Sequence, residues 1–303
     1  MDYFQTEIKQ WSDWQAVVTT SAVFEPLIRQ IYSSEHEPFK TPVAVATDFC
    51  ATFAVGPTQI AIFPPAVVAA TTRDRYQAER FSLTRLARLQ LMAPRLRHAG
   101  FIFDAYQFYY VIYQPLTGVT LTEFKATAEP LAKATLGQQL GAALLKLNTA
   151  VPQFNQVDHT EVEQLATWQP LGATFATERA QFLAQQTVQF DQFVHGELTG
   201  ETIIVTADQV GFCHFQTAQV APRQTELVPL LLAAAYQDPD LMAGLKKGLA
   251  SPDLVTDLLI GLLWRADGPS WIRQVMGRET GITLAQVQAQ LAITINGKAG
   301  AKG

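Results

Sequence analysis

The chain has 303 residues, of which 48% are hydrophobic and 16% are charged, and its formal net charge is -5 at pH 7. This much apolar material excludes a disordered chain and is enough for a large core, in one large domain or two smaller ones. The mildly acidic balance gives no general attraction to nucleic acid or to an anionic membrane surface, so neither is expected as a partner.

The beginning of the sequence, MDYFQTEIKQWSDW, has no basic start followed by an apolar run, so no secretory signal is expected. The longest apolar stretches, at 227–235 and 254–264, are too short to cross a bilayer. Cys50 and Cys213 are far apart and lie in apolar surroundings, which predicts two buried free thiols and no disulfide or metal site. We therefore expect a cytoplasmic protein.

The residue pattern in the first third of the chain predicts a small sheet with helices. Apolar residues at helical spacing predict a helix over 23–32, and β-forming runs on either side of Gly56-Pro57 predict a hairpin over 51–63. A helix over 74–91 and two strands within 100–113 are expected next. The aromatic residues of those two strands are expected in the core of the sheet: Phe101, Phe103, Phe108, Tyr109 and Tyr110.

The rest of the chain is predicted to be mainly helical. Three-four periodicity predicts a helix over 134–148, a further helix is expected over 175–193, and helices fill 226–291. A hairpin is expected over 202–215. This order favours an α+β fold in which a small antiparallel β lobe precedes a helical lobe, and it argues against a doubly wound sheet. The expected boundaries are 1–113 for the β-rich lobe, 114–120 for a hinge, 121–295 for the helical lobe and 296–303 for a flexible tail.

The segment VHGELTGETIIV, residues 194–205, carries the most specific motif. It resembles the catalytic loop HGDLHPGNILV of the aminoglycoside phosphotransferase, choline kinase and fructosamine kinase family. Residues 51–63 resemble the family's nucleotide-covering hairpin, 110–121 its hinge, and 136–148 the helix that follows the hinge. The resemblance spans roughly residues 40–235, and it implies a two-lobed protein-kinase-like fold.

The resemblance also places the family's functional residues on this sequence, and most of them are changed. Ala61 stands at the position of the lysine that grips the nucleotide phosphates, and Glu79 at that of its acidic partner. Glu197 replaces the catalytic aspartate, Thr202 the metal-binding asparagine and His214 the magnesium-binding aspartate. A methyl group supplies no positive charge, and Mg²⁺ requires hard oxygen ligands, so imidazole is a poor substitute. At position 197, glutamate keeps the carboxylate of the family's aspartate but places it about one methylene further from the backbone.

Several residues have simpler interpretations that stand beside the functional ones. Without a lysine partner, Glu79 is expected to be a solvated helix residue. His36, His98 and His159 stand alone in polar surroundings and are expected to be exposed. No set of metal ligands is predicted.

These substitutions favour a degenerate family member, a pseudokinase that acts as a binding or regulatory scaffold for an unidentified small molecule or protein. The alternative is an active ATP-dependent phosphotransferase for an aminoglycoside, a choline-like alcohol or a sugar, with Glu197 orienting the acceptor hydroxyl. ATP and magnesium are expected only under that alternative. A third interpretation, an unrelated α+β protein, requires the ordered matches to be accidental.

Overall fold

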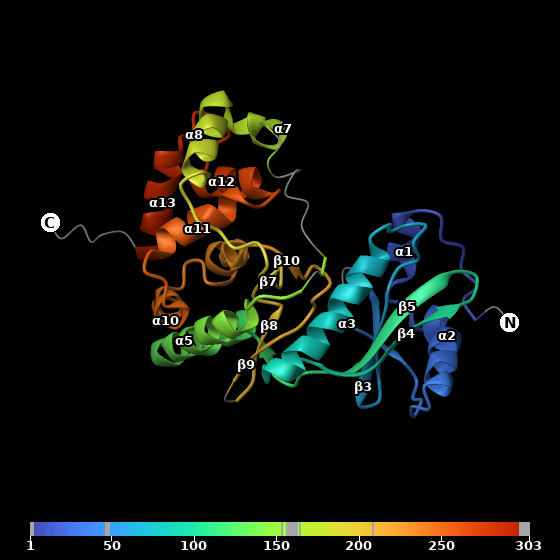
Figure 1. Cartoon of the computed structure of the whole chain (residues 1–303). Coiled ribbons are helices and arrows are strands. Elements are labelled where there is room, and N and C mark those ends of the chain that lie inside the picture. Colours follow the sequence, from blue (N-terminus) through green and yellow to red (C-terminus); the bar gives the residue numbers. More distant parts are fainter. Residues whose placement is uncertain are drawn as a thin grey trace. The chain divides into compact units, whose positions relative to one another are not determined.

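The computed structural model describes residues 3–45, 49–152, 154–155, 163, 165–207 and 209–296. It divides into two compact units (Figure 1). The first comprises Met1–Thr117 together with Phe212–Thr217, and the second comprises Gly118–Gly211 and Ala218–Gly303.

The first unit is built on a five-stranded antiparallel sheet with the strand order β1-β2-β3-β5-β4. Its strands are β1 (Val43–Val45), β2 (Ala51–Val55), β3 (Thr58–Ile62), β4 (Arg95–Phe103) and β5 (Gln107–Gln114). Its helices are α1 (Trp11–Val17), α2 (Ser21–Ser34) and α3 (Thr72–Leu89). The predicted hairpin over 51–63 is confirmed, because β2 and β3 pair antiparallel. In its turn, Gly56 has a positive φ of 65°, a conformation that glycine adopts freely.

The two faces of this sheet pack against different helices. Phe53, Ile60 and Ile62 of the sheet belong to one apolar cluster with Trp14 of α1 and Phe24 of α2. Successive residues of a strand point to opposite faces of the sheet. The residues of β3 and β5 that alternate with those of the cluster therefore lie on the other face. The stacked pair Tyr76 and Tyr109, with ring centroids 4.8 Å apart, shows that α3 covers that second face.

The second unit is mainly helical, as predicted. Its helices of regular α type are α4 (Leu121–Thr127), α5 (Pro130–Leu147), α7 (Leu165–Trp168), α8 (Ala173–Leu183), α9 (Leu227–Pro229), α10 (Pro239–Leu249), α11 (Leu254–Leu263), α12 (Gly268–Met276) and α13 (Leu284–Asn296). The single turns are η1 (Gln169–Leu171), η2 (Arg223–Glu226) and the π-helical η3 (Leu230–Ala234). Together, the two units give the expected α+β fold with an antiparallel sheet first and helices after it.

Short strands in the later part of the chain frame the segment that carries the HGE motif. They are β6 (Val119–Thr120), β7 (Phe193–Val194), β8 (Ile203–Val205), β9 (Val210–Phe212) and β10 (Gln219–Val220). β7 pairs with β10, and β6, β8 and β9 form a three-stranded sheet with β8 in the middle. The hairpin predicted over 202–215 is therefore present, but its second strand ends at Phe212.

Helices α5 and α10 approach each other backbone to backbone. A Cβ atom at Gly244 would collide with the carbonyl oxygen of Ala134, and one at Gly248 would collide with that of Gln138. A Cβ at Gly137 would meet the carbonyl oxygen of Leu241 in the same way. Only residues without a side chain permit this separation, so the glycines fix how closely the two helices pack.

Three expectations from the sequence need correction. The helix expected over 175–193 ends at Leu183, and the chain then reaches β7 without a further helix. Phe101 and Phe103 are 54% and 71% exposed rather than part of the core, although Phe108 and Tyr110 are buried as predicted. His98 is half-buried, because Glu35 and Glu37 hold its two ring nitrogens at 2.9 Å each.

Other expectations are confirmed or fall outside the described residues. His36 is exposed, as predicted, whereas His159 and the tail beyond residue 296 lie outside the described residues. Cys50 and Cys213 are both buried, as predicted, and the structure places neither in a disulfide bond. Among the described residues, no helix combines the length and the apolar character that a membrane span requires.

Candidate functional site

Ala61 lies in the middle of the sheet of the first unit. Its neighbours across the strands are Thr52 and Val111, and its side chain is buried. Ile60 and Ile62 face the cluster formed with α1 and α2, so alternation turns Ala61 toward the face that α3 covers. Ala61 and Glu79 of α3 therefore belong to the same side of the sheet.

Glu79 is buried, with 4% of its surface exposed, so the expectation of a solvated helix residue is wrong. Its carboxylate accepts a hydrogen bond from the backbone N–H of Phe215. The carboxylate atom Oε2 has no hydrogen-bond partner among the described residues. Burial outweighs this hydrogen bond and raises the pKa of Glu79 to about 7.

The segment Phe212–Thr217 belongs to the same unit as Glu79, although it follows the HGE motif in sequence. The N–H of Phe212 donates to the carbonyl oxygen of Met92 at 2.9 Å, and the side chains of Phe212 and Phe215 are fully buried. His214 lies between them, exposed, with a positive φ of 63°. Positive φ is uncommon outside glycine but is enriched for histidine. The segment thus anchors itself through its phenylalanines and presents His214 at the surface.

The loop between β7 and β8 carries Glu197 and Thr202. The Glu197 side chain is exposed, and its backbone N–H donates to Nδ1 of His195 at 3.4 Å. The Thr202 hydroxyl donates to the carbonyl oxygen of Glu197 at 2.9 Å and accepts the N–H of Thr199 at 2.9 Å. Both bonds close the loop on itself, so the Thr202 hydroxyl serves the loop's own structure.

A buried carboxylate holds the start of this loop. Glu226 is 1% exposed, and it accepts the backbone N–H groups of His195 and Gly196. The Asn148 side chain at the end of α5 donates to Glu226 at 3.4 Å and to the carbonyl oxygen of Phe193 at 2.8 Å. Burial raises the pKa of Glu226 to about 7, although these bonds and the Arg265 charge act in the opposite direction.

Arg265 ties the same loop to the segment between α11 and α12. Its guanidinium donates to the carbonyl oxygens of Gly196 at 3.4 Å and Thr225 at 3.3 Å. It also forms a two-pronged pair with Asp267, at 2.7 Å and 2.9 Å, and Asp267 accepts the indole N–H of Trp271 at 2.9 Å. These pairs hold the backbone from which Glu197 projects.

Asn148, Glu226 and Arg265 are functional candidates that sequence reasoning missed. Only Glu226 left a visible signal, because it is a lone carboxylate directly before the apolar run at 227–235. A charged residue next to such a run is expected to be buried and hydrogen-bonded. The roles of Asn148 and Arg265 depend on contacts across 78 and 69 residues of sequence, which no local pattern contains.

The predicted site residues therefore form two groups. Ala61, Glu79 and His214 belong to the first unit, and Glu197 and Thr202 share one loop of the second. That the two groups meet stays a prediction. Within the described part of the chain, no three histidine, cysteine, aspartate or glutamate residues come together as a metal site would require. Magnesium does not fit the residues present, because Thr202 is engaged in its loop and His214 offers nitrogen rather than oxygen.

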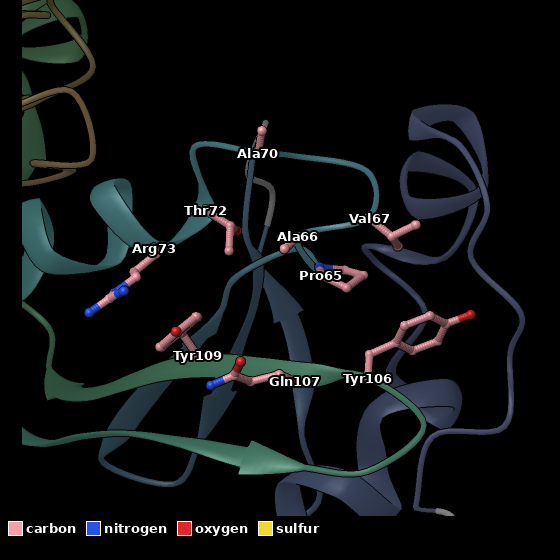
Figure 2. A pocket seen from close by; sticks show the side chains of 9 residues that line it. All are labelled: Pro65, Ala66, Val67, Ala70, Thr72, Arg73, Tyr106, Gln107 and Tyr109. Carbon is pink, nitrogen blue, oxygen red and sulfur yellow. The ribbon is translucent and has the colours of Figure 1, made fainter.

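The first unit also has a shallow groove of about 390 Å³ near the start of α3 (Figure 2). Pro65, Ala66 and Val67 line it on one side, and Gln107 and Tyr109 of β5 lie on another. Ala61, Glu79 and His214 are not among its lining residues. The groove is thus not lined by these three candidate site residues.

Comparison with known proteins gives a family match over most of the chain. Residues 53–259 match the model of the phosphotransferase enzyme family. No curated protein matches the sequence.

Solved structures of similar fold cover nearly the whole chain at low sequence identity. The GDP complex of wild-type aminoglycoside 2'-phosphotransferase-IIIa has a TM-score of 0.62 and 14% identity, with 91% of this chain and 99% of that one aligned. A choline/ethanolamine kinase family protein from Mesorhizobium loti has a TM-score of 0.55 and 12% identity over 93% and 92% of the two chains. An amicoumacin kinase with AMP-PNP and Ca²⁺ has a TM-score of 0.58 and 13% identity over 88% and 92%. These likenesses show the kinase-like fold that the sequence resemblance implied.

Proposed function

The chain belongs to the phosphotransferase enzyme family, and we propose that it acts there as a pseudokinase, a scaffold that binds a ligand or a partner without transferring phosphate. The observation that carries this proposal is the environment of Glu79. In the family that the sequence resembles, the acidic residue at this position pairs with a lysine, and here that lysine position is Ala61.

The loss of the lysine is matched by a changed role for its partner. Glu79 is buried and accepts the N–H of Phe215, and none of the described salt bridges includes it. A carboxylate that is buried and bonded in this way does not position a cationic side chain for binding a phosphate group. Charged groups that clamp a transferring phosphoryl group act as preorganised electrostatic stabilisers, and removing one typically costs about 3 kcal/mol of transition-state stabilisation.

The residues at the metal positions support the same proposal. Thr202 directs its hydroxyl into the loop, and His214 replaces a carboxylate with an imidazole. Neither is a good ligand for Mg²⁺. The losses at Ala61, Thr202 and His214 would act on one unit, so their energies are not summed.

One observation favours the alternative, an active phosphotransferase. Glu197 is exposed on a loop that Glu226, Asn148 and Arg265 hold in place, and a carboxylate on a rigid loop suits the orientation of a hydroxyl acceptor. Under this alternative Glu197 accepts the hydroxyl proton. A group other than Ala61 must then hold the nucleotide phosphates.

Calorimetric titration with Mg·ATP, followed by an ATPase assay and a screen of aminoglycoside, choline-like and sugar acceptors, distinguishes the two functions. We expect weak or metal-independent nucleotide binding and no turnover. Micromolar binding that requires magnesium, with turnover lost in Glu197→Ala, would establish the active enzyme instead. Glu201→Ala is the matched control, because Glu201 is a second exposed carboxylate of the same loop.

A restorative variant tests the assignment of the positions. The combined change Ala61→Lys, Thr202→Asn and His214→Asp should give magnesium-dependent nucleotide binding that the unmodified protein lacks. We propose with it that these residues, Glu79 and Glu197 surround one ligand site. An experimental structure with His214 more than about 15 Å from Glu197 contradicts that arrangement, because only 16 residues join them through a tight hairpin.

A further inference from the structure

A second groove of the first unit lies between the end of α3 and the start of β4. It has a volume of about 510 Å³, within the range that is typical of small-molecule sites. Leu83 and Ala87 line it from α3, Leu96 lines it from β4, and Leu91 and Pro94 line it from the connection between the two elements. Apolar side chains therefore form much of its surface.

Backbone hydrogen bonds fix the connection that lines this groove. α3 ends where Gln90 adopts a positive φ of 54°, and the N–H of Leu91 donates to the carbonyl oxygen of Leu86 at 3.0 Å. The carbonyl oxygen of Met92 accepts the N–H of Phe212 at 2.9 Å. The fold itself therefore forms the groove, and a ligand that binds there does not have to order a loop first.

Two arginines add positive charge to this apolar surface. Arg88 lines the groove from α3 and Arg95 from β4, and both side chains are exposed. Neither takes part in the salt bridges or cation–π contacts of the described residues. No aspartate or glutamate is among the described residues that line the groove. By contrast, Arg97 of β4 pairs with Glu37 at 3.0 Å.

A structural role accounts for only one of these two arginines. Arg88 lies in the last turn of α3, where a positive charge is favourable beside the carbonyl groups of the helix end. Arg95 is the first residue of β4, opposite Gln114, so it serves no helix end. Apolar walls beside guanidinium groups that lack a counterion are complementary to a molecule with one apolar part and one anionic part.

We propose that this groove binds a small organic anion that carries one acidic group on an apolar chain or ring. The apolar part lies against Leu91 and Leu96. The acidic group accepts hydrogen bonds from Arg88 and Arg95, whose planar sets of donors match a carboxylate or a sulfonate. A single bend of the chain, residues 83–96, lines the whole groove, so its size suits a small molecule rather than an extended polypeptide. The inference is independent of whether the protein transfers phosphate.

Fluorescence titration of the full chain with anilinonaphthalene sulfonate, an anionic dye with apolar rings, tests the proposal. We expect saturable binding that is roughly tenfold weaker in the double variant Arg88→Gln, Arg95→Gln, which loses the charge-assisted hydrogen bonds. Phenylnaphthylamine, which has the same rings without the sulfonate, should bind both proteins equally.

The matched control is the double variant Arg73→Gln, Arg80→Gln, because it removes two exposed charges from the same helix outside this groove. It should bind the sulfonate dye like the unmodified protein. No weakening in the variant at Arg88 and Arg95, or equal weakening in both double variants, overturns the proposal.

Filling the groove tests where the dye binds. Ala87→Trp places a large ring in the groove, because Ala87 is an exposed residue of its wall, and it should abolish binding of both dyes. Ala70→Trp is the matched control, since Ala70 is an exposed alanine of the separate groove in Figure 2, and it should leave binding unchanged. Circular dichroism establishes that all variants are folded. Binding that persists in Ala87→Trp, or that is lost equally in both variants, contradicts the assigned site.

Competition identifies the class of occupant. Decanoate carries one carboxylate on an apolar chain and should displace the sulfonate dye from the unmodified protein. Polyglutamate offers charge without an apolar part and should not displace it. Displacement by polyglutamate would mean that charge alone suffices, as on a docking surface for an acidic polypeptide, and would overturn the proposal. A dye that decanoate does not displace would be an adventitious additive only, with the same consequence.

Discussion

Glu79 accepts a hydrogen bond from the backbone N–H of Phe215, the residue directly after His214. The contact joins α3 to a segment that lies 136 residues further along the chain. It also places a buried carboxyl group at the point where Phe212–Thr217 packs onto the first unit.

Replacing Glu79 with glutamine should remove part of the pH dependence of stability. Burial raises the pKa of Glu79 from 4.5 to about 7, so the folded state holds the proton more tightly than the unfolded state. Stability from this group is therefore full below about pH 4.5 and falls as the pH rises toward 7. Urea unfolding should show Glu79→Gln more stable than the unmodified protein by about 1–3 kcal/mol at pH 8 and nearly equal at pH 4.5.

The control for this comparison is Glu201→Gln, which changes an exposed carboxyl group and should behave like the unmodified protein at both pH values. Equal stability of Glu79→Gln and the unmodified protein at pH 8 would show that Glu79 carries no buried charge there.

Glu226→Ala should destabilise the second unit and loosen the loop that bears Glu197. The change removes the acceptor of the buried His195 N–H and of the half-buried Gly196 N–H, at a cost of about 3 kcal/mol. Glu226→Gln keeps an acceptor oxygen and should cost about 1 kcal/mol. Amide hydrogen exchange at His195 and Gly196 should accelerate in the alanine variant and change little in the glutamine variant. Unchanged exchange in both variants would mean that Glu226 does not hold the loop.

Gly244→Ala should separate α5 from α10. The new Cβ would collide with the carbonyl oxygen of Ala134, a backbone atom that cannot rotate away. We expect a loss of about 2–3 kcal/mol in urea unfolding, typical of overpacking at a close contact. Ala243→Leu is the matched control, since it enlarges an exposed neighbour on the same helix and should cost less than about 0.5 kcal/mol. Equal losses in the two variants would refute the backbone-to-backbone packing.

The two thiols should be inert in the folded protein. Cys50 and Cys213 are buried, and burial raises the pKa of Cys50 well above its ordinary value, which suppresses the reactive thiolate. A chromogenic disulfide reagent should react with both thiols in denaturant and with neither at a comparable rate under native conditions. Rapid reaction of one thiol in the native state would identify an opening of the structure around that residue.

The sequence by itself determined several of the longer helices and strands, and the order of motifs that indicated the family. The hairpin over 51–63 and the helix over 134–148 follow from local periodicity and turn residues, which act over a few positions. The sequence also identified the chemical losses at Ala61 and His214, because a missing charge is visible in the residue itself.

Only the tertiary structure decided which residues are buried and what they contact. Glu79 was expected to be solvated because Ala61 stands at the position of its lysine partner, yet α3 turns it toward the sheet and Phe215. Phe101 appeared to belong to the core because aromatic strands usually do, yet β4 is an edge strand and leaves its ring exposed. Glu226 meets His195 across 31 residues. Burial depends on which elements pack together over long sequence distances, and a pattern that spans one element does not contain that information.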